Sequence, residues 1–273
     1  MSIFDAILLG ILQGLTEFLP VSSSGHLILV EDLLHVSHDY DIAFEVFVHF
    51  GTLLSVVLMF WKEIKSIVLS LLGGIIKPSS IKHLFKNDDY FRLAVFIIIG
   101  CIPAGLVGVF FEHQIEFLFT DPKFVSVMLL ITGLILFLTK FANPKDDSKV
   151  GLPSTIIIGI AQAVAIIPGI SRSGITISSA LFSGVSRQNS AKFSFLLALP
   201  VIFGATILKT KELFGSPMAS ARLIPLVVGT LVAAVFGYIS IRLVLSILQK
   251  RRFSWFAYYC FIVGILGLLF IGQ

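Results

Sequence analysis

The sequence predicts an all-α polytopic membrane protein with six transmembrane helices and two re-entrant helical hairpins in an inverted-topology repeat. Three observations lead to this fold class. Hydrophobic residues make up 56% of the 273 residues and charged residues 13%, whereas soluble domains carry about 25% charge. Six apolar stretches are long enough to cross a hydrocarbon layer of ~30 Å. Two further apolar segments are interrupted halfway by a short polar break, and these two align with each other.

The first interrupted segment opens the chain at about residues 5–35. Its half-length apolar stretches, 5–19 and 25–35, are separated by a break rich in proline and serine. This pattern is typical of a re-entrant hairpin, because irregular backbone persists at membrane depth only where protein or water satisfies its polar groups. Three predicted spans follow, at about 42–61, 91–111 and 123–141.

The second half of the chain repeats this order of elements. A second predicted hairpin, at about 154–186, has half-helices at 154–168 and 174–186. The break between them, 169–173, holds glycine, serine and an arginine. The remaining predicted spans lie at about 193–209, 223–247 and 253–272.

The two hairpins align when the chain is shifted by 149 residues. Five identities then pair Gly10 with Gly159, Gln13 with Gln162, Ser22 with Ser171, Ser24 with Ser173 and Gly25 with Gly174. We therefore predict an internal duplication, 1–145 and 150–273, which forms one integrated membrane domain. Each repeat has an odd number of spans, so the second hairpin enters from the face opposite the first.

The lysines and arginines orient the molecule. The loops on one face, at 62–90, 140–153, 187–192 and 248–252, carry 13 of them, and the loops on the other face carry 4. Cytoplasmic loops are enriched in basic residues, so the first face is predicted to be cytoplasmic and the first hairpin to open outward. The basic residues are scattered between apolar segments, so we expect no nucleic acid partner. Membrane lipids are expected partners, and a homodimer stays open.

The first hairpin carries the candidate catalytic carboxylate. Gln13 and Glu17 are four residues apart and share a helical face. Glu17 is predicted at the inner end of a short membrane helix, where a carboxylate costs about 3 kcal/mol and normally marks a site or a pathway. Because it is a hard oxygen ligand beside a predicted phosphate site, we expect Glu17 to help hold a divalent cation, Mg²⁺ or Ca²⁺.

The polar break after Glu17 supplies the candidate nucleophile. Ser23 is the predicted nucleophile, and His26, three residues later, is the predicted acceptor of its proton. Attack by His26 itself is the alternative. Gln13 and three residues of this break are expected to bind the substrate, namely Ser22, Ser24 and Gly25.

The second break supplies a cation. Arg172 is the one arginine in the run 151–186, which is otherwise uncharged. It is interpreted either as the counter-ion of Glu17 or as a fork-shaped grip on phosphate oxygens, and one arginine can do both in turn. The helix N-termini near Gly25 and Gly174 are expected to add free N–H groups to the same anion site. The other expected binding residues there are Ser171, Ser173, Gly174 and Thr176.

The polar pair Glu45 and His49 shares a helix face in the first span. Two residues do not make a metal site. Hydrogen bonding within the core is therefore the favoured interpretation of Glu45 and His49, and a role as metal ligands is the alternative.

These motifs resemble those of one known family. The run from Gln13 to His26, the run from Pro168 to Thr176, and the later blocks 184–187 and 193–200 resemble the bacitracin-resistance (BacA/UppP) family of undecaprenyl-diphosphate phosphatases. The resemblance covers essentially the whole chain. Many family members have Glu where this chain has Gln13, which leaves Glu17 as the one carboxylate of that motif.

The resemblance implies an enzyme of the bacterial plasma membrane. It implies hydrolysis of undecaprenyl diphosphate to the monophosphate and inorganic phosphate, which recycles the carrier lipid of peptidoglycan synthesis and lowers sensitivity to bacitracin. It also implies a divalent cation. A secondary transporter or flippase is the alternative, because inverted repeats with broken helices are transporter architecture.

Overall fold

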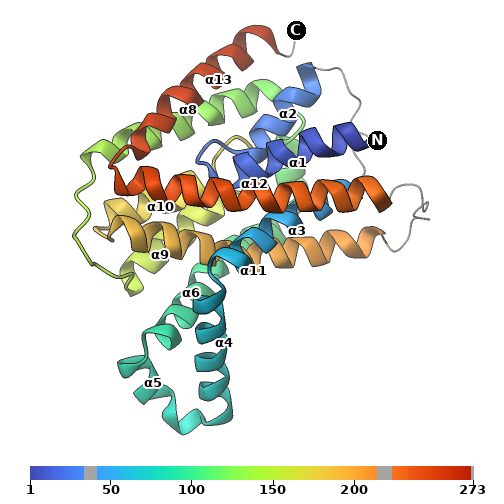
Figure 1. The fold of residues 1–273 in the computed structure, drawn as a ribbon. Helices are drawn as coiled ribbons and strands as arrows, with labels where there is room; N and C mark the ends of the chain where they lie inside the picture. The colour runs from blue at the N-terminus through green and yellow to red at the C-terminus, as the bar shows by residue number, and fades with distance from the viewer. Residues whose placement is uncertain (34–41, 214–222, 272–273) are drawn as a thin grey trace.

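The computed structural model describes residues 1–33, 42–213 and 223–271, and every regular element in these ranges is a helix (Figure 1). The α-helices are α1 (Ile3–Phe18), α2 (Ser23–Leu33), α3 (Ile42–Met59), α4 (Trp61–Ile76), α5 (Ile81–Asn87), α6 (Asp89–Phe110), α7 (Glu112–Leu118), α8 (Pro122–Leu138), α9 (Leu152–Val164), α10 (Arg172–Phe182), α11 (Arg187–Leu213), α12 (Leu223–Gln249) and α13 (Phe256–Phe270). Short 3₁₀ turns lie at Pro78–Ser80, Thr139–Phe141 and Phe253–Trp255.

The long helices confirm a multi-pass membrane protein. Within the described ranges, five helices are long and apolar enough to cross a membrane, and the number rises to six if the bent pair of α3 and α4 is one span. Each of the six predicted spans overlaps a helix of the structure. Parts of the predicted outer loops, at 34–41 and 214–222, lie outside the described residues.

The predicted cytoplasmic loop at 62–90 differs from the expectation, because most of it is helical. Helix α4 turns by 85° from α3, and α4 and α5 project from the rest of the bundle (Figure 1). Lys and Glu residues among the apolar residues of α4 weaken the hydropathy signal that marks a span. The charges of this segment therefore predict a loop where the structure has a helix.

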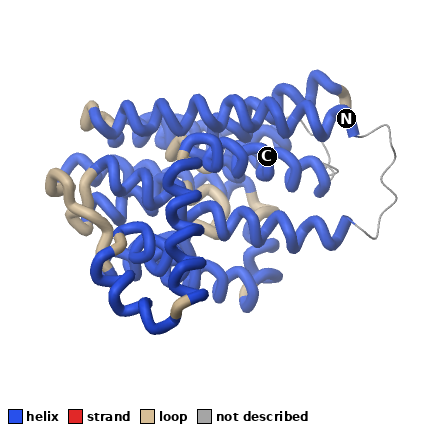
Figure 2. The backbone as a smooth tube through the Cα atoms, turned by 60° about the horizontal axis from the view of Figure 1, so that its bottom comes forward, coloured by secondary structure: helices blue, strands red, loops and turns tan. Residues whose placement is uncertain are grey.

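Each segment predicted as a re-entrant hairpin folds as two helices joined by a break. Helix α1 ends at Phe18 and α2 begins at Ser23, whereas α9 ends at Val164 and α10 begins at Arg172. Loops other than these breaks join the helices mostly at the ends of the bundle (Figure 2). Each break contains one residue with left-handed backbone, Ser22 at φ 67° and Gly169 at φ 88°. Both breaks are largely buried, so their backbone groups need partners inside the protein.

Close helix contacts relate the two halves of the chain. A Cβ atom at Gly10 of α1 would lie 2.7 Å from the carbonyl oxygen of Gly229 in α12, and one at Gly159 of α9 would lie 2.8 Å from that of Gly100 in α6. Small residues allow membrane helices to approach this closely. Gly10 and Gly159 are also paired by the 149-residue shift, so the first helix of each hairpin meets the second span of the other half.

Thr132 of α8 holds the second break in place. Its hydroxyl donates to the carbonyl oxygen of Gly169 at 2.9 Å and accepts from the Ser171 N–H at 3.1 Å. We expect Thr132→Val, which keeps the shape and removes both bonds, to lower the free energy of unfolding by about 2 kcal/mol. Denaturant unfolding in detergent measures this, with the exposed Thr120→Val as control. Equal stability of the two variants would contradict the role given to Thr132.

Candidate active site

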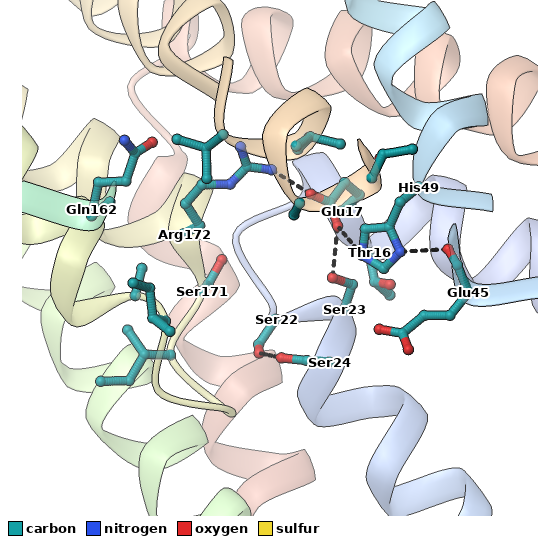
Figure 3. Close-up of a pocket in the computed structure, with 18 of the residues that line it drawn as sticks. Thr16, Glu17, Ser22, Ser23, Ser24, Glu45, His49, Gln162, Ser171 and Arg172 are labelled. Carbon is teal, nitrogen blue, oxygen red and sulfur yellow. Dashed lines mark hydrogen bonds and ion pairs between the residues drawn. The ribbon is translucent and has the colours of Figure 1, made fainter. Parts of the chain in front are cut away.

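A cavity of about 260 Å³ lies where the two hairpins meet. Glu17, Ser22, Ser23 and Ser24 line it from the first hairpin (Figure 3). The second hairpin contributes Gln162, Ser171 and Arg172, and α3 contributes Glu45 and His49. The two breaks are thus brought to one cavity, which Ser23 and Arg172 both line.

Glu17 lies at the centre of the polar contacts in this cavity. Its carboxylate is buried, and Oε1 forms an ion pair with Nη2 of Arg172. Oε2 accepts hydrogen bonds from the Ser23 hydroxyl at 2.8 Å and from Nε2 of Gln13 at 3.0 Å. A buried carboxylate needs a partner of this kind, because an unpaired charge is very costly in an apolar surrounding. The counter-ion role considered for Arg172 is therefore present in the structure.

Several buried polar atoms around this ion pair have no hydrogen-bond partner among the described residues. They are Nη1 of Arg172, Oε1 of Gln13, and both Nε2 and Oε1 of Gln162. Each such atom costs about 1–3 kcal/mol of desolvation. Three of these atoms belong to Arg172 and Gln162, which line the cavity, so the cavity has hydrogen-bonding capacity that the chain itself does not use.

The structure corrects the predicted pairing of Ser23 with His26. The Ser23 hydroxyl donates to Glu17. The His26 ring is directed to α13, where Nε2 lies 2.8 Å from the Tyr259 hydroxyl and the two rings stack at 5.5 Å. Nδ1 lies 2.8 Å from the carbonyl oxygen of Ser22, which can only accept. Both ring nitrogens are therefore occupied away from the cavity, because α2 turns the His26 side chain toward α13.

The predicted free N–H groups at the two half-helix starts are also corrected. The N–H of Gly25 donates to Ser22 Oγ at 3.3 Å, and that of Gly174 donates to Ser171 Oγ at 3.1 Å. Serine is a preferred N-cap because its hydroxyl satisfies these first donors. These two N–H groups are therefore already used by serine side chains and are not free to bind an anion.

The other predicted binding residues are divided between lining and packing roles. Ser22 and Ser24 line the cavity, and their hydroxyls lie 3.4 Å apart. Ser173 instead donates to the Leu19 carbonyl oxygen at 3.2 Å, which joins the second break to the first. Thr176 donates to the Arg172 carbonyl oxygen at 2.7 Å and contacts Ser194 Oγ at 2.6 Å. Ser173 and Thr176 therefore hold the hairpins in place.

His49 and Glu45 were placed in the core by sequence reasoning, and they line the cavity as well. Nδ1 of His49 lies 2.8 Å from the Glu45 carbonyl oxygen, which is the expected core hydrogen bond. Nε2 of His49 lies 3.9 Å from Oε2 of Glu17 (Figure 3). The sequence signal was the i, i+4 spacing of two polar residues on a membrane span, which places both on one face.

The side chains at the cavity set limits on a divalent cation. Among the described residues, no group of three or more His, Cys, Asp or Glu side chains is arranged to hold a metal. Two carboxylates, of Glu17 and Glu45, line the cavity together with three serine hydroxyls of the first break. Mg²⁺ is commonly held by one or two carboxylates and the phosphates of the substrate. These side chains are too few to enclose a cation by themselves. They fit a cation that is also bound by the phosphates of a substrate.

Taken together, the fold and the cavity define a helical multi-pass membrane protein with a cavity whose polar residues come from two interrupted helical segments and from α3. The chain matches the family model described as Bacitracin resistance protein BacA over residues 6–266. The chain belongs to this family.

Similar proteins extend over the whole chain. An undecaprenyl-diphosphatase of Salinibacter ruber is 42% identical over 269 residues, which cover 98% of this chain and 99% of that protein. An undecaprenyl-diphosphatase of Halothermothrix orenii is 41% identical over 274 residues, 100% of this chain and 99% of that protein. One of Methanobrevibacter smithii is 42% identical over 280 residues, 100% of this chain and 98% of that protein.

Proposed function

We propose that this protein hydrolyses undecaprenyl diphosphate to undecaprenyl phosphate and inorganic phosphate at the cavity between the two hairpins. The observation that carries the proposal is the arrangement around Glu17, where a hydroxyl and an arginine from different hairpins contact the two oxygens of one carboxylate. A nucleophile, a proton acceptor and a cation are thereby held within one buried site. The undecaprenyl phosphate formed would serve peptidoglycan synthesis. Conversion of the diphosphate to the monophosphate would also lower sensitivity to bacitracin.

The cavity walls suit a lipid diphosphate. Beyond the polar residues, the lining is apolar and comes mainly from α11 and the second break, with one residue each from α3, α6 and the turn after α7. Burying each methylene of a lipid chain contributes about 0.8 kcal/mol. The apolar lining residues are Val46, Ala104, Phe119, Ala165, Ile166, Ile170, Val201, Ile202 and Ala205.

Substrate binding would exchange the partner of Arg172. In the structure Nη2 of Arg172 is paired with Glu17, and Nη1 has no hydrogen-bond partner among the described residues. A diphosphate entering the cavity offers oxygens that match the arginine fork. The guanidinium would therefore turn from Glu17 toward the phosphate, and Glu17 would become a stronger acceptor for the Ser23 proton.

The chemical step follows from the contact between Ser23 and Glu17. Ser23 Oγ attacks the distal phosphorus, the bond from that phosphorus to the bridging oxygen breaks, and the lipid monophosphate leaves with the electron pair. The Ser23 proton passes to Glu17, which already accepts it in a hydrogen bond of 2.8 Å. Water then cleaves the phosphoserine, which releases inorganic phosphate and restores the hydroxyl. Arg172 offsets the charge of the transferred phosphoryl group.

Glu17 and Glu45 would hold a divalent cation, Mg²⁺ or Ca²⁺, together with the diphosphate. Such a cation supplies charge neutralisation on the phosphate oxygens. We expect Glu17→Gln to lower kcat about 100-fold or more and to flatten the dependence of the remaining activity on Mg²⁺. Metal titration of phosphate release measures both. A variant whose half-saturating Mg²⁺ concentration equals that of the wild type would contradict the metal role of Glu17.

The arrangement in the membrane would be six spans and two re-entrant hairpins in two inverted repeats, 1–145 and 150–273. The matched contacts of Gly10 with α12 and of Gly159 with α6 support this division. The distribution of Lys and Arg supports an outward-facing first hairpin in the plasma membrane.

Sealed vesicles of known orientation test the orientation. We expect phosphate to be released on the face opposite the basic loops that precede α6 and follow α12, because the hairpin with Glu17 and Ser23 is predicted to open there. Release only on the face of those loops would reverse the proposed orientation.

Phosphate release from undecaprenyl diphosphate by the pure protein in detergent tests the function itself. Detergent micelles hold no gradient, so a transporter or flippase would release no phosphate. We expect multiple turnovers, and their absence with a folded protein and added Mg²⁺ would exclude the hydrolase.

A further inference from the structure

Gln162 is a buried residue whose carboxamide is poorly paired in the described part of the chain. It lies in α9, lines the cavity, and is 2% exposed. Neither polar atom of its carboxamide has a hydrogen-bond partner among the described residues. The Cys101 thiol contacts it, but a thiol is a weak hydrogen-bonding group, and this one donates to the Leu197 carbonyl oxygen at 3.7 Å. Among the described residues, the desolvated carboxamide is therefore compensated by a weak thiol contact at most.

Comparison with Gln13 explains why this carboxamide is unpaired. The 149-residue shift places Gln162 on Gln13 and Ile166 on Glu17. In α1 the glutamine donates to the carboxylate one turn later. In α9 the residue one turn later is Ile166, which has no polar side-chain atom. The second hairpin thus keeps the amide and lacks the internal partner that the first hairpin provides.

Arg172 supplies a second unused donor in the same cavity. Its Nη2 is paired with Glu17, whereas Nη1 is buried and has no hydrogen-bond partner within the described ranges. The Arg172 guanidinium lies between the Gln162 carboxamide and the Glu17 carboxylate (Figure 3). An oxyanion between these donors would accept from the amide N–H of Gln162 and from Nη1, and a hydrogen bond from a charged donor is about twice as strong as a neutral one.

The position of this donor pair favours one of the two phosphates. The distal phosphate, which is transferred, belongs beside Ser23 and Glu17. Gln162 lies on the other side of Arg172, on the helix that packs against α6 through Gly159 and Gly100. Ala165 and Ile166, which follow Gln162 along the chain, line the apolar part of the cavity together with Ala104 of α6. The phosphate that carries the lipid therefore belongs on the Gln162 side.

We propose that Gln162, with Nη1 of Arg172, binds the phosphate that stays on the lipid after hydrolysis. This rests on the proposed function, because it assigns the two phosphates of that substrate to different parts of the cavity. Gln162 would be a substrate-binding residue that selects a diphosphate linked to a lipid over free phosphate.

Binding of the two products to the full-length protein in detergent tests this assignment. Undecaprenyl phosphate retains the lipid-linked phosphate, and inorganic phosphate is the transferred one. Affinities are obtained from the rise in unfolding temperature during titration with each product. For Gln162→Met we expect about tenfold weaker binding of undecaprenyl phosphate and a change of less than about twofold for inorganic phosphate. Ile160→Met, an exposed position of the same helix, is the matched control.

The ligand-free protein gives a second readout. Met fills a similar volume and removes an unpaired buried amide, so Gln162→Met should unfold at the same or a higher temperature than the wild type. A lower unfolding temperature would indicate a structural role and overturn the proposal. Gln162→Glu has the same size and replaces the donor by an acceptor, so it should also weaken undecaprenyl phosphate binding.

The remaining outcomes are separable. Unchanged binding of undecaprenyl phosphate in both variants, or equal weakening for both products, would overturn the role of Gln162. Failure of the wild type to release phosphate from undecaprenyl diphosphate would instead refute the proposed function, since the binding measurement needs no turnover.

Discussion

Ser23→Ala should lower kcat for phosphate release about 10⁴-fold, because loss of a nucleophile removes the covalent step and the acceptor Glu17 has no hydroxyl proton to take. KM should change little, since Arg172 and the lipid-binding walls are left in place. Steady-state phosphate release with undecaprenyl diphosphate measures both constants. Ser66→Ala in the projecting helix α4 removes a hydroxyl bonded only to its own helix and is the matched control.

The alternative mechanisms give different results for the same variant. If water attacked directly and Ser23 only bound phosphate, Ser23→Ala would raise KM and keep most of kcat. If His26 attacked, the variant would still form a phosphoenzyme. Either result would contradict the assignment of Ser23.

The second large effect is expected for Arg172. Arg172→Lys keeps the positive charge beside Glu17 and removes the planar fork that can contact a carboxylate and a phosphate at once. We expect kcat/KM to fall about 100-fold, less than the 10³–10⁵ that a full loss of an arginine costs in phosphoryl transfer. Arg242→Lys, at an exposed arginine of α12, should have no effect.

Stability measurements separate chemistry from folding in this comparison. Arg172→Gln leaves the buried Glu17 carboxylate without its counter-ion, which costs about 3–5 kcal/mol. We therefore expect Arg172→Gln to be both inactive and destabilised, and Arg172→Lys to be folded and slow. An Arg172→Lys variant with wild-type kcat/KM would show that the guanidinium fork is not used.

The helices that cross the membrane could be predicted well because the bilayer allows few solutions. A span must be apolar for about 20 residues and must satisfy its own backbone, so composition and length suffice to place α6, α8, α12 and α13. Helix α4 was missed because its charges resemble those of a loop. Its helical form depends on packing, as in the contact of Gly74 with the Phe91 ring, which sequence alone does not provide.

The charged residues of the candidate site could be predicted from the sequence, because burying a charge is costly. A carboxylate in α1 and an arginine in the second break are too costly in apolar segments without a partner or a function, which is why Glu17 and Arg172 could be paired from sequence. The side-chain direction of His26 could not be predicted, because it depends on Tyr259, more than 230 residues later in the chain. Gln162 was visible only as a repeat identity, and its lack of a partner is a property of the folded protein.

Trapping of the phosphorylated enzyme tests directly whether Ser23 is the nucleophile. Enzyme in excess over undecaprenyl diphosphate that is labelled in its distal phosphate would be quenched during the first turnover, and the labelled residue would be identified by mass spectrometry. Our account predicts phosphate on Ser23, absent from Ser23→Ala. Phosphate on His26, or no labelled protein at any time during a first turnover that releases phosphate, would contradict it.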